Sequence, residues 1–297
     1  MKRAIVTGAT GAIGTALVDN LISSGVEVLV LLREGSARRG AIKKHPLVEV
    51  KVCSLENLKT LKNDTDKTYD VFYHFAWAGT FGDTRNDMYL QNKNVEYALD
   101  AVKVAKEFGC KLFIGAGSQA EYGRVEGVLT PTTPAFPENG YGIAKLCAGK
   151  MTREYARQLG LKHIWVRILS IYGPHDGAQT MVMSTITKLR NGEKAKFTKG
   201  EQLWDYLYSE DAAEAFRLMG EKGKDGKTYV LGSGNAKQLK EYIEIIGRVL
   251  KVQNLIELGA IPYSEKQVMH LCADISELTA DTGWLPETDF ESGIEKF

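Results

Sequence analysis

Short apolar segments alternate with longer amphipathic ones through the first half of the chain. Runs of apolar and β-branched residues, which predict buried strands, occupy residues 4–6, 26–32, 48–52, 71–75, 111–115 and 163–168. Helical patterns separate most of these runs. This alternation predicts an α/β fold with a doubly wound parallel sheet covered by helices on both faces. Ligands of such sheets lie at the carboxyl ends of the strands, so functional residues are expected just after each run.

The first run leads directly into a glycine-rich turn, Thr7-Gly8-Ala9-Thr10-Gly11-Ala12-Ile13-Gly14, which opens an amphipathic segment. Glycines spaced by three let the backbone turn sharply, approach a diphosphate closely and pack a helix on a strand, while the helix N-terminus offers free N–H groups. The motif therefore predicts a Rossmann-type, dinucleotide-binding fold. The residues expected around the phosphates are Gly8, Thr10, Gly11, Ala12, Ile13 and Gly14.

After about residue 170 the rhythm of the chain changes. Residues 181–189 and 238–250 have helical patterns, and short strand-like pieces surround Lys196 and Tyr206. Segments near 207–232 are predicted to return to the first domain. We therefore expect residues 1–170 to form an NAD(P)-binding domain and residues 171–297 to form mainly a smaller C-terminal α/β substrate lobe, with the two interwoven.

Composition narrows the choice of partner. The 297 residues are 44% hydrophobic and 25% charged, with a formal net charge of +1, which favours neither nucleic acid nor acidic lipid as a partner. A small molecule is therefore expected. The chain shows no signal peptide or membrane span, so a cytoplasmic location is expected. Four scattered cysteines, without a CxxC pair, are interpreted as reduced core thiols with no metal site: Cys53, Cys110, Cys147 and Cys272.

A basic residue, Arg33, ends the second run, about 20 residues beyond the glycine turn, where an acidic side chain would bind an NAD ribose. Arg33, helped by Ser36, Arg38 or Arg39, would instead hold the extra phosphate of NADP. NADP is thus the expected cofactor and NAD the alternative; a solvated surface arginine is the structural alternative. Ser54 and Leu55 follow the third strand, near the expected adenine.

Tyr141 and Lys145 lie four residues apart in the helical pattern of residues 139–159, so their side chains share one face. A phenol has a pKa of about 10, too high for efficient proton transfer near neutrality, and a nearby ammonium lowers it by favouring the phenolate. Lys145 is therefore expected to tune Tyr141. The structural alternative is an aromatic ring packed on a lysine stem.

Ser118 comes just after the strand predicted at residues 111–115, at the edge where ligands are expected. Its hydroxyl would donate to a substrate carbonyl while Tyr141 supplies a proton and a nicotinamide the hydride. A turn-forming serine among glycines is the structural alternative.

Further motifs extend along the chain: residues 70–76 (DVFYHFA), Asn92, Ser118 with Tyr122-Gly123, Tyr141-Gly142-Ile143-Ala144-Lys145, Arg167 with Tyr172-Gly173-Pro174, residues 205–213 (DYLYSEDAA) and Gly283-Trp284-Leu285-Pro286. With the glycine turn, they resemble the short-chain dehydrogenase/reductase superfamily, specifically its extended branch of nucleotide-sugar epimerases, dehydratases and ketoreductases. The resemblance spans nearly the whole chain.

The resemblance implies roles for individual residues. Ser118, Tyr141 and Lys145 would form the catalytic triad, with Lys145 also touching the nicotinamide ribose. Asn92 would steady the site from its helix, and His74 would be a packed strand residue. Phe75 and Ala76 would pass beneath the cofactor. Besides Ser118 and Tyr141, the residues expected near the substrate are Trp77, which also borders the cofactor, Gln119, Ser170 and Trp204.

Departures from the family pattern narrow the choice among the family's activities. Dehydratases carry an Asp-Glu pair directly after the triad hydroxyl residue, where this chain has Gln119 and Ala120. Glu121 lies one position further on, where its side chain is expected to point elsewhere. Ser170 replaces a usual Asn and Trp204 a usual Arg, which leaves the contacts to the nucleotide diphosphate open, with Lys188, Arg190 and Lys196 as nearby candidates.

These features predict an NADPH-dependent 4-ketoreductase of a nucleotide-activated deoxysugar. The patterns around residues 117–123 and 204–206 are similar to reductases of the abequose-synthase type. An NAD-dependent nucleotide-sugar 4-epimerase is the alternative, because it would use the same triad. A non-catalytic NADP-binding redox sensor is a further alternative, although such sensors typically lose the Tyr-Lys pair that this chain keeps.

Relatives of this kind commonly form homodimers in which two long helices of each subunit build a four-helix bundle. The corresponding helices here are predicted at about residues 88–108 and 141–159. Their apolar residues Leu99, Val102, Leu146 and Met151 would suit such an interface, although each helix must also bury one face on its own sheet.

Overall fold

The computed structural model describes residues 1–297 and has a seven-stranded parallel sheet at its centre. In spatial order its strands are β12 (Thr228–Leu231), β7 (Lys162–Ile168), β5 (Leu112–Ala116), β4 (Val71–His74), β1 (Arg3–Thr7), β2 (Glu27–Leu32) and β3 (Val48–Val52). The predicted α/β, Rossmann-type doubly wound fold is confirmed. Its order reverses direction between β1 and β4, which is where such sheets form a ligand crevice.

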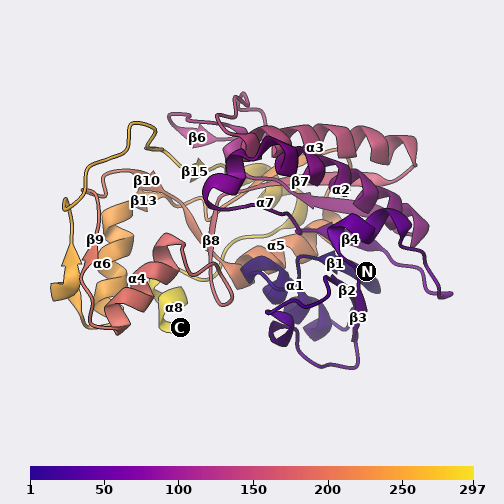
Figure 1. The fold of residues 1–297 in the computed structure, drawn as a ribbon, viewed down its shortest axis with the longest axis horizontal. Helices are drawn as coiled ribbons and strands as arrows, with labels where there is room; N and C mark the ends of the chain where they lie inside the picture. The colour runs from indigo at the N-terminus through magenta and orange to yellow at the C-terminus, as the bar shows by residue number, and fades with distance from the viewer.

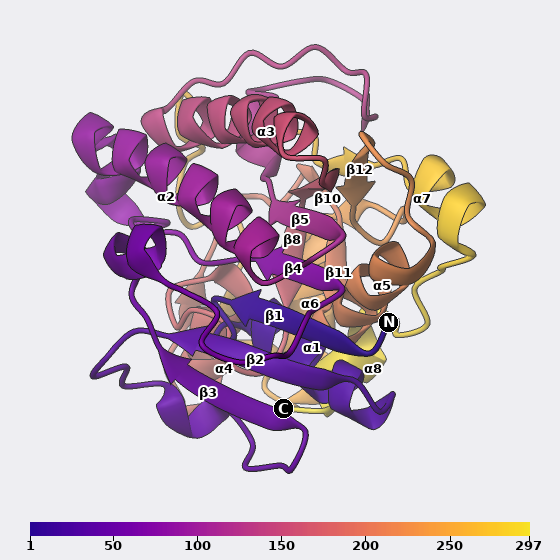
Figure 2. The ribbon, with the colours of Figure 1, turned by 90° about the vertical axis from the view of Figure 1, so that its right-hand side faces the viewer.

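Helices cover both faces of the sheet (Figures 1 and 2). One face carries α2 (Met88–Glu107) and α3 (Gly140–Gln158), and the other carries α1 (Ala12–Ser23), α5 (Ser209–Lys222) and α7 (Ser276–Thr282). Because side chains alternate along a strand, Ala4 and Val6 of β1 pack into one core while Ile5 packs into the other. Burial on both faces explains why central strands such as β2 and β5 have continuous apolar runs.

Two polar residues fix where the long helices begin. The Asp87 carboxylate accepts a hydrogen bond from Leu90 N at 3.0 Å and caps α2. The Asn139 side chain accepts one from Gly142 N at 2.8 Å and caps α3. N-terminal caps of this type satisfy N–H groups that have no partner within the helix. The cap of α3 places Tyr141 in the first turn of that helix and Lys145 one turn later.

A smaller lobe lies on the left in Figure 1, where the C-terminus also lies. It contains α4 (Met181–Arg190), α6 (Leu239–Val249), α8 (Phe290–Glu295) and two short strand pairs, β9 (Ala195–Lys196) with β14 (Ile256–Glu257) and β10 (Leu203–Trp204) with β13 (Lys237–Gln238). Its core is a cluster of 11 buried residues rich in aromatic side chains, among them Tyr172, Tyr242 and Phe290. The lobe thus has its own hydrophobic core.

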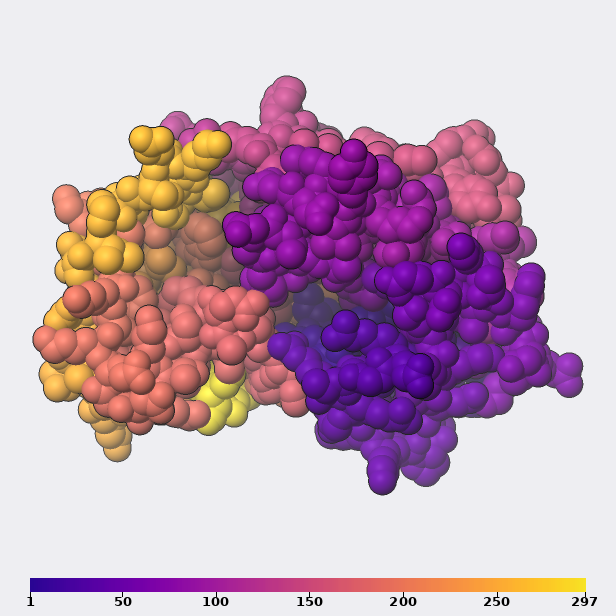
Figure 3. Space-filling model, in the orientation of Figure 1, coloured from indigo at the N-terminus to yellow at the C-terminus, as the bar shows by residue number.

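The chain passes back and forth between the sheet and the lobe. After the lobe helix α4, β11 (Tyr206–Tyr208) pairs with β8 (Ser170–Tyr172), and β12 then joins the central sheet beside β7. The last strand, β15 (Cys272–Ala273), pairs with β6 (Val128–Leu129). The space-filling view shows a hollow between the lobe and the indigo and violet residues of the sheet half (Figure 3).

Three expectations from the sequence concern burial, helix length and metal binding. Cys53 and Cys110 are buried, but Cys147 is exposed and Cys272 is half-buried, so the interpretation of all four as core thiols was wrong. Cys147 is exposed because it lies on the outer face of α3.

None of the helices combines the length and apolar character needed to cross a membrane. No three His, Cys, Asp or Glu side chains lie together in a way that would hold a metal ion.

Candidate active site

The crevice between β1 and β4 is formed by two loops in close contact. Gly8, just after β1, has φ = +71°, and a Cβ added there would lie 2.6 Å from Ala76 N in the loop after β4. A Cβ added at Gly14 would lie 2.3 Å from Gly8 O. Both values are shorter than atoms tolerate, so this packing requires glycine at both positions. The two glycines let the backbone of the turn after β1 pack directly on the loop after β4 and on itself, and the outer edge of this turn stays open.

That open edge has the properties that a diphosphate needs. Gly11 stands at the N-terminal cap of α1 in an extended conformation and provides no side-chain cap. The first N–H groups of a helix have no intrahelical partner, and the helix dipole favours an anion beside them. Thr10, Ala12 and Ile13 are partly exposed around the buried Gly14. The turn therefore fits the phosphates of a dinucleotide, with Phe75 and Ala76 fixed beneath it by hydrogen bonds to Thr7 O and Thr7 Oγ1.

Basic side chains surround the end of β2. Arg33 and Arg38 are exposed and neither forms an ion pair, although Arg38 donates to His175 O at 3.3 Å. Ser54 is half-buried at the start of a short 3-10 helix, η2 (Leu55–Thr60). Its hydroxyl, after the backbone N–H of Glu56 itself, lowers the pKa of the Glu56 carboxyl, and Arg33 contributes to the same shift. The guanidinium groups thus have free donors for an added phosphate.

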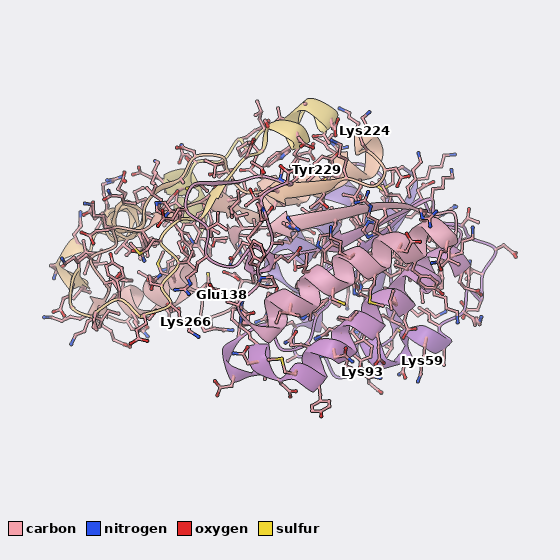
Figure 4. The ribbon with its side chains drawn as sticks, turned by 90° about the horizontal axis from the view of Figure 1, so that it is seen from above. Lys59, Lys93, Glu138, Lys224, Tyr229 and Lys266 are labelled. Carbon is pink, nitrogen blue, oxygen red and sulfur yellow. The ribbon has the colours of Figure 1, made fainter.

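The structure brings Ser118, Tyr141 and Lys145 together at the carboxyl end of β5. Ser118 begins the 3-10 helix η4 (Gln119–Glu121), and its hydroxyl accepts from Ala120 N at 3.2 Å. Burial raises the pKa of the Tyr141 phenol, and the Ser118 hydroxyl acts against this effect and lowers it. Lys145 is 3% exposed and donates from Nζ to Ala116 O at 2.6 Å. Seen from above, α3 lies beside α2, with Glu138 just before its first turn (Figure 4).

The electrostatics of Tyr141 differ from the expectation. Burial raises the pKa of Tyr141, whereas the Ser118 hydroxyl and the Arg85 guanidinium lower it. The guanidinium carbon of Arg85 lies 4.4 Å from the centre of the Tyr141 ring, and Lys145 Nζ lies 5.7 Å from it. Arg85 is therefore the nearer cation. The sequence carried no signal for it, because it is a lone arginine in a polar loop.

Lys145 itself is strongly affected by burial. Burial lowers its pKa to about 7, and the Glu121 carboxylate acts in the opposite direction. The ammonium lies 3.8 Å from the centre of the Trp77 indole, a cation–π contact. Trp77 also meets Tyr141 edge to face at 6.2 Å and donates its N–H to Gln91 Oε1 at 2.9 Å. The Trp77 indole thus packs against both Lys145 and Tyr141.

Glu121 lies behind Ser118, and its carboxylate is fully occupied by hydrogen bonds within the protein. Its side chain is 1% exposed and accepts hydrogen bonds from Ser118 N, Trp165 Nε1 and Arg167 Nε, each at 2.9 Å. A carboxylate held in this way anchors the loop and is not free to exchange a proton with a substrate. Neither Gln119 nor Ala120 supplies a carboxylate.

The expectation for Asn92 was wrong. Asn92 lies on the exposed face of α2, whereas the buried amide belongs to Asn94 two residues later. Asn94 accepts from Ala78 N and donates to Ala78 O, both at 2.9 Å, and so fixes the loop after β4. Two residues along a helix change the direction of a side chain by about 200°, which explains why Asn94 and not Asn92 faces the site.

Ser170 and Trp204 are partners of each other in this structure. The Trp204 indole N–H donates to Ser170 Oγ at 2.8 Å, and Tyr242 donates its hydroxyl to Trp204 O at 3.0 Å. Sequence reasoning singled out both residues but did not connect them. Of the basic candidates nearby, Arg190 donates to Phe297 O at 2.7 Å, and Lys188 and Lys196 are exposed.

His74 is a packed strand residue. Its ring is 3% exposed, and Nδ1 lies 2.9 Å from Thr7 Oγ1. Burial lowers the pKa of the imidazole to about 3, so the ring stays neutral near pH 7. It links β4 to β1 directly below the crevice.

Comparison with known proteins agrees with this geometry. A sequence profile described as the NAD dependent epimerase/dehydratase family matches residues 4–232. CDP-abequose synthase from Salmonella typhimurium is 24% identical over 98% of this chain and 96% of that protein. The fold is similar to that of UDP-N-acetylglucosamine 4-epimerase from Methanobrevibacter ruminantium, with a TM-score of 0.88, 22% identity, and 99% and 96% of the two chains covered. It is also similar to dTDP-glucose 4,6-dehydratase from Bacillus anthracis in complex with NAD, with a TM-score of 0.85, 21% identity, and 100% and 95% covered.

Proposed function

The chain belongs to the NAD dependent epimerase/dehydratase family, and we propose that it is an NADPH-dependent 4-ketoreductase of a nucleotide-activated deoxysugar. The members of this extended short-chain dehydrogenase/reductase family that it matches are enzymes acting with NAD(P) on nucleotide sugars. The full-length similarity to an abequose synthase supports a reductase, and the arrangement of the site supports the reaction class.

One observation carries the proposal: Ser118, Tyr141 and Lys145 converge at the carboxyl end of β5 while Glu121 is held by Arg167. Reduction of a ketone needs a proton donor and a group that polarises the carbonyl, and these side chains supply both. Elimination of water would need a free carboxylate beside Ser118, and this site has none. The arrangement therefore favours reduction over dehydration.

Each residue has a defined part in the reaction. The Ser118 hydroxyl donates to the carbonyl oxygen of the sugar and polarises it. When bound, NADPH supplies two electrons and a hydrogen to the carbonyl carbon. Tyr141 gives its phenolic proton to the oxygen, and Ser118 and nearby cations stabilise the phenolate that remains. Lys145 would bind the ribose hydroxyls of the nicotinamide half, which requires its ammonium to leave Ala116 O or to share its protons.

The cofactor half of the proposal rests on Arg33 and Arg38. Both are exposed, follow β2 in the chain and have no carboxylate partner in an ion pair. A 2′-phosphate would find charge-assisted donors here, whereas NAD offers only hydroxyls. The preference for NADPH over NADH follows.

Residues 171–297 would mainly form the substrate lobe. Trp77 and Gln119 would contact the substrate from the sheet side, and the hydrogen-bonded pair of Ser170 and Trp204 would contact it from the lobe side. A nucleotide-sugar 4-epimerase remains the second candidate, because the same three residues would oxidise and re-reduce a carbinol. The assembled triad argues against a non-catalytic sensor.

We further propose a homodimer built from α2 and α3. An apolar stripe is exposed on these helices and includes Met88, Tyr89, Ile143 and Met151. Leu99 and Leu146 are half-buried, but Val102 is fully buried on the protein's own sheet and is not available for a dimer interface.

Replacing both Ile143 and Met151 by Glu should convert a dimer to a monomer in sedimentation velocity. An unchanged mass would contradict this interface.

Turnover tests the proposed activity. The wild-type protein should oxidise NADPH in proportion to a 4-keto-6-deoxy nucleotide sugar, tested with CDP, dTDP, GDP and UDP forms. Tyr141→Phe should lower kcat by about 10²- to 10⁴-fold. Tyr155→Phe is a matched control, because Tyr155 lies on the same helix and its hydroxyl makes no hydrogen bond within the protein. Folded Tyr141→Phe protein with near wild-type turnover would contradict the proposal.

A further inference from the structure

Arg85 lies against the face of the tyrosine that delivers the proton. It belongs to the 3-10 helix η3 (Gly82–Asn86), which joins the loop after β4 to α2. Its guanidinium carbon is 4.4 Å from the centre of the Tyr141 ring, a stacking distance. The Tyr141 ring also packs against Trp77, at 6.2 Å between ring centres and nearly perpendicular to it. The ring is therefore in contact with both a guanidinium and an indole.

The loop that carries Arg85 is fixed to both neighbouring helices. Gln91 of α2 donates from Nε2 to Gly79 O at 2.8 Å and to Thr84 O at 2.9 Å. Asn86 Oδ1 accepts from Gly140 N at 3.0 Å, at the residue directly before Tyr141. Arg85 itself donates to Thr80 O at 3.3 Å. These contacts fix the backbone on both sides of Arg85 relative to the first turn of α3.

The charge of Arg85 is not used in an ion pair. None of the protein's ion pairs includes it, and the nearby Asp87 carboxylate is occupied as the cap of α2. Its side chain is half-buried. The other charged groups that face Tyr141 are Lys145, whose Nζ is 5.7 Å from the ring centre, and the carboxylate of Glu121 behind Ser118. Burial, and to a smaller extent Glu121, raise the pKa of Tyr141, whereas the Ser118 hydroxyl and the Arg85 guanidinium lower it.

We propose that Arg85 is a positioning residue for the reaction, which orients the Tyr141 ring and stabilises the phenolate formed when the phenol gives up its proton. In that step the O–H bond of Tyr141 breaks, its proton forms a new O–H bond on the substrate oxygen, and the electron pair stays on the phenolate. A guanidinium over the ring face attracts the phenolate more strongly than the neutral phenol. The kinetic part of this proposal rests on the proposed reductase function, but the effect on Tyr141 does not.

The test uses the variants Arg85→Met and Arg85→Lys in the full-length protein. Met keeps the aliphatic bulk and removes the charge, whereas Lys keeps the charge and loses the planar stack. Arg157→Met is the matched control, because Arg157 is an exposed arginine on α3 paired with Glu154, far from the first turn. Protein labelled with [ζ-¹³C]tyrosine reports each phenol directly, and the Tyr141→Phe spectrum identifies the Tyr141 resonance among the 13 tyrosines.

In Arg85→Met, the ¹³C resonance of Tyr141 should begin to titrate at a higher pH than in wild type, with Arg85→Lys between the two and Arg157→Met unchanged. The kcat of Arg85→Met for the keto sugar should fall about 10-fold with KM within twofold of wild type, and the alkaline decline of kcat should move to higher pH. Arg85→Lys should recover part of kcat.

Two results would overturn the proposal. One is a Tyr141 titration in Arg85→Met that superimposes on the wild type. The other is a raised KM with unchanged kcat, which would make Arg85 a substrate-binding group. The ¹³C titration needs no substrate, so a wild-type protein without reductase activity would overturn the proposed function and leave this measurement valid.

Discussion

On the sheet side of the crevice the tightest contacts join backbone atoms, whereas the lobe is held together by buried aromatic side chains. At Gly8 and Gly14 the absence of a Cβ allows two loops to touch. In the lobe, Tyr172, Tyr206, Tyr242 and Phe290 form a cluster in which neighbouring ring centres lie 4.6 to 6.1 Å apart. A contact between backbone atoms tolerates no added Cβ, whereas a contact between side chains can be changed one group at a time. Substitutions on the two sides should therefore differ in kind.

The largest effect is expected from Gly14→Ala, on the backbone side. The added Cβ would meet Gly8 O at 2.3 Å, so the turn must open and its N–H groups lose their alignment. NADPH affinity should fall at least about 100-fold, or roughly 2.7 kcal/mol, in a fluorescence titration. Gly40→Ala is the control, because nothing lies within 4 Å of a Cβ there. Affinity within threefold of wild type for Gly14→Ala would contradict the comparison.

Lys145→Met tests the junction between the two sides. Activity should fall about 10²- to 10⁴-fold, yet the cofactor-free protein should become more stable to urea, by about 1 to 3 kcal/mol at pH 6, because a buried ammonium is removed.

The pH dependence follows from the pKa of about 7, which burial lowers from 10.5. Above pH 7 the folded wild type releases a proton that the unfolded chain keeps, so wild-type stability rises with pH and the difference from Lys145→Met shrinks toward pH 10. Lys150→Met, at an exposed position of the same helix, should change little at either pH. If the difference in unfolding stability between wild type and Lys145→Met stayed constant from pH 6 to pH 10, the pKa of Lys145 would not be lowered by burial.

A smaller effect is expected from Arg33, which directly follows β2 on the sheet side of the crevice. Arg33→Ala should weaken NADPH about 10- to 50-fold and NADH less than threefold, because only NADPH carries a 2′-phosphate that the guanidinium can bind. Competitive titrations with both cofactors measure the ratio. Equal losses for the two cofactors would show that Arg33 does not recognise that phosphate.

The smallest effects are expected on the lobe side. Ser170→Ala and Trp204→Phe each remove one side of the hydrogen bond from Trp204 Nε1 to Ser170 Oγ. Each should raise KM about 2- to 10-fold with kcat within twofold, since one such bond contributes about 0.5 to 1.5 kcal/mol. The double variant should cost no more than the larger single loss, because both remove the same interaction. Additive losses would mean that the two residues contact the substrate independently.

The sheet half was more accessible to sequence reasoning than the details of the site. Apolar runs located its first six strands, because burial on both faces leaves the central strands largely apolar and because β3 at the edge of the sheet still has three valines. The glycine turn was recognisable because its spacing follows from geometry. The residues that the sequence missed or misplaced, Arg85 and Asn94, act through tertiary contacts. Their direction depends on where α2 and η3 lie relative to α3, and spacing alone does not give that. The Ser170–Trp204 pair depends likewise on β8 lying beside β11.

The most direct test of the central claim follows one hydrogen atom. The protein is incubated with a 4-keto-6-deoxy nucleotide sugar that it turns over and with NADPH stereospecifically deuterated at nicotinamide C4, using both diastereomers. Mass spectrometry and NMR should find one deuterium at C4 of the sugar from one diastereomer only, with one NADPH consumed per product and none transferred by Tyr141→Phe at the same time point. No deuterium transfer from either diastereomer, with interconversion of the 4-hydroxy epimers in a parallel incubation that supplies the 4-hydroxy sugar and consumes no NADPH, would contradict the reductase and establish the epimerase.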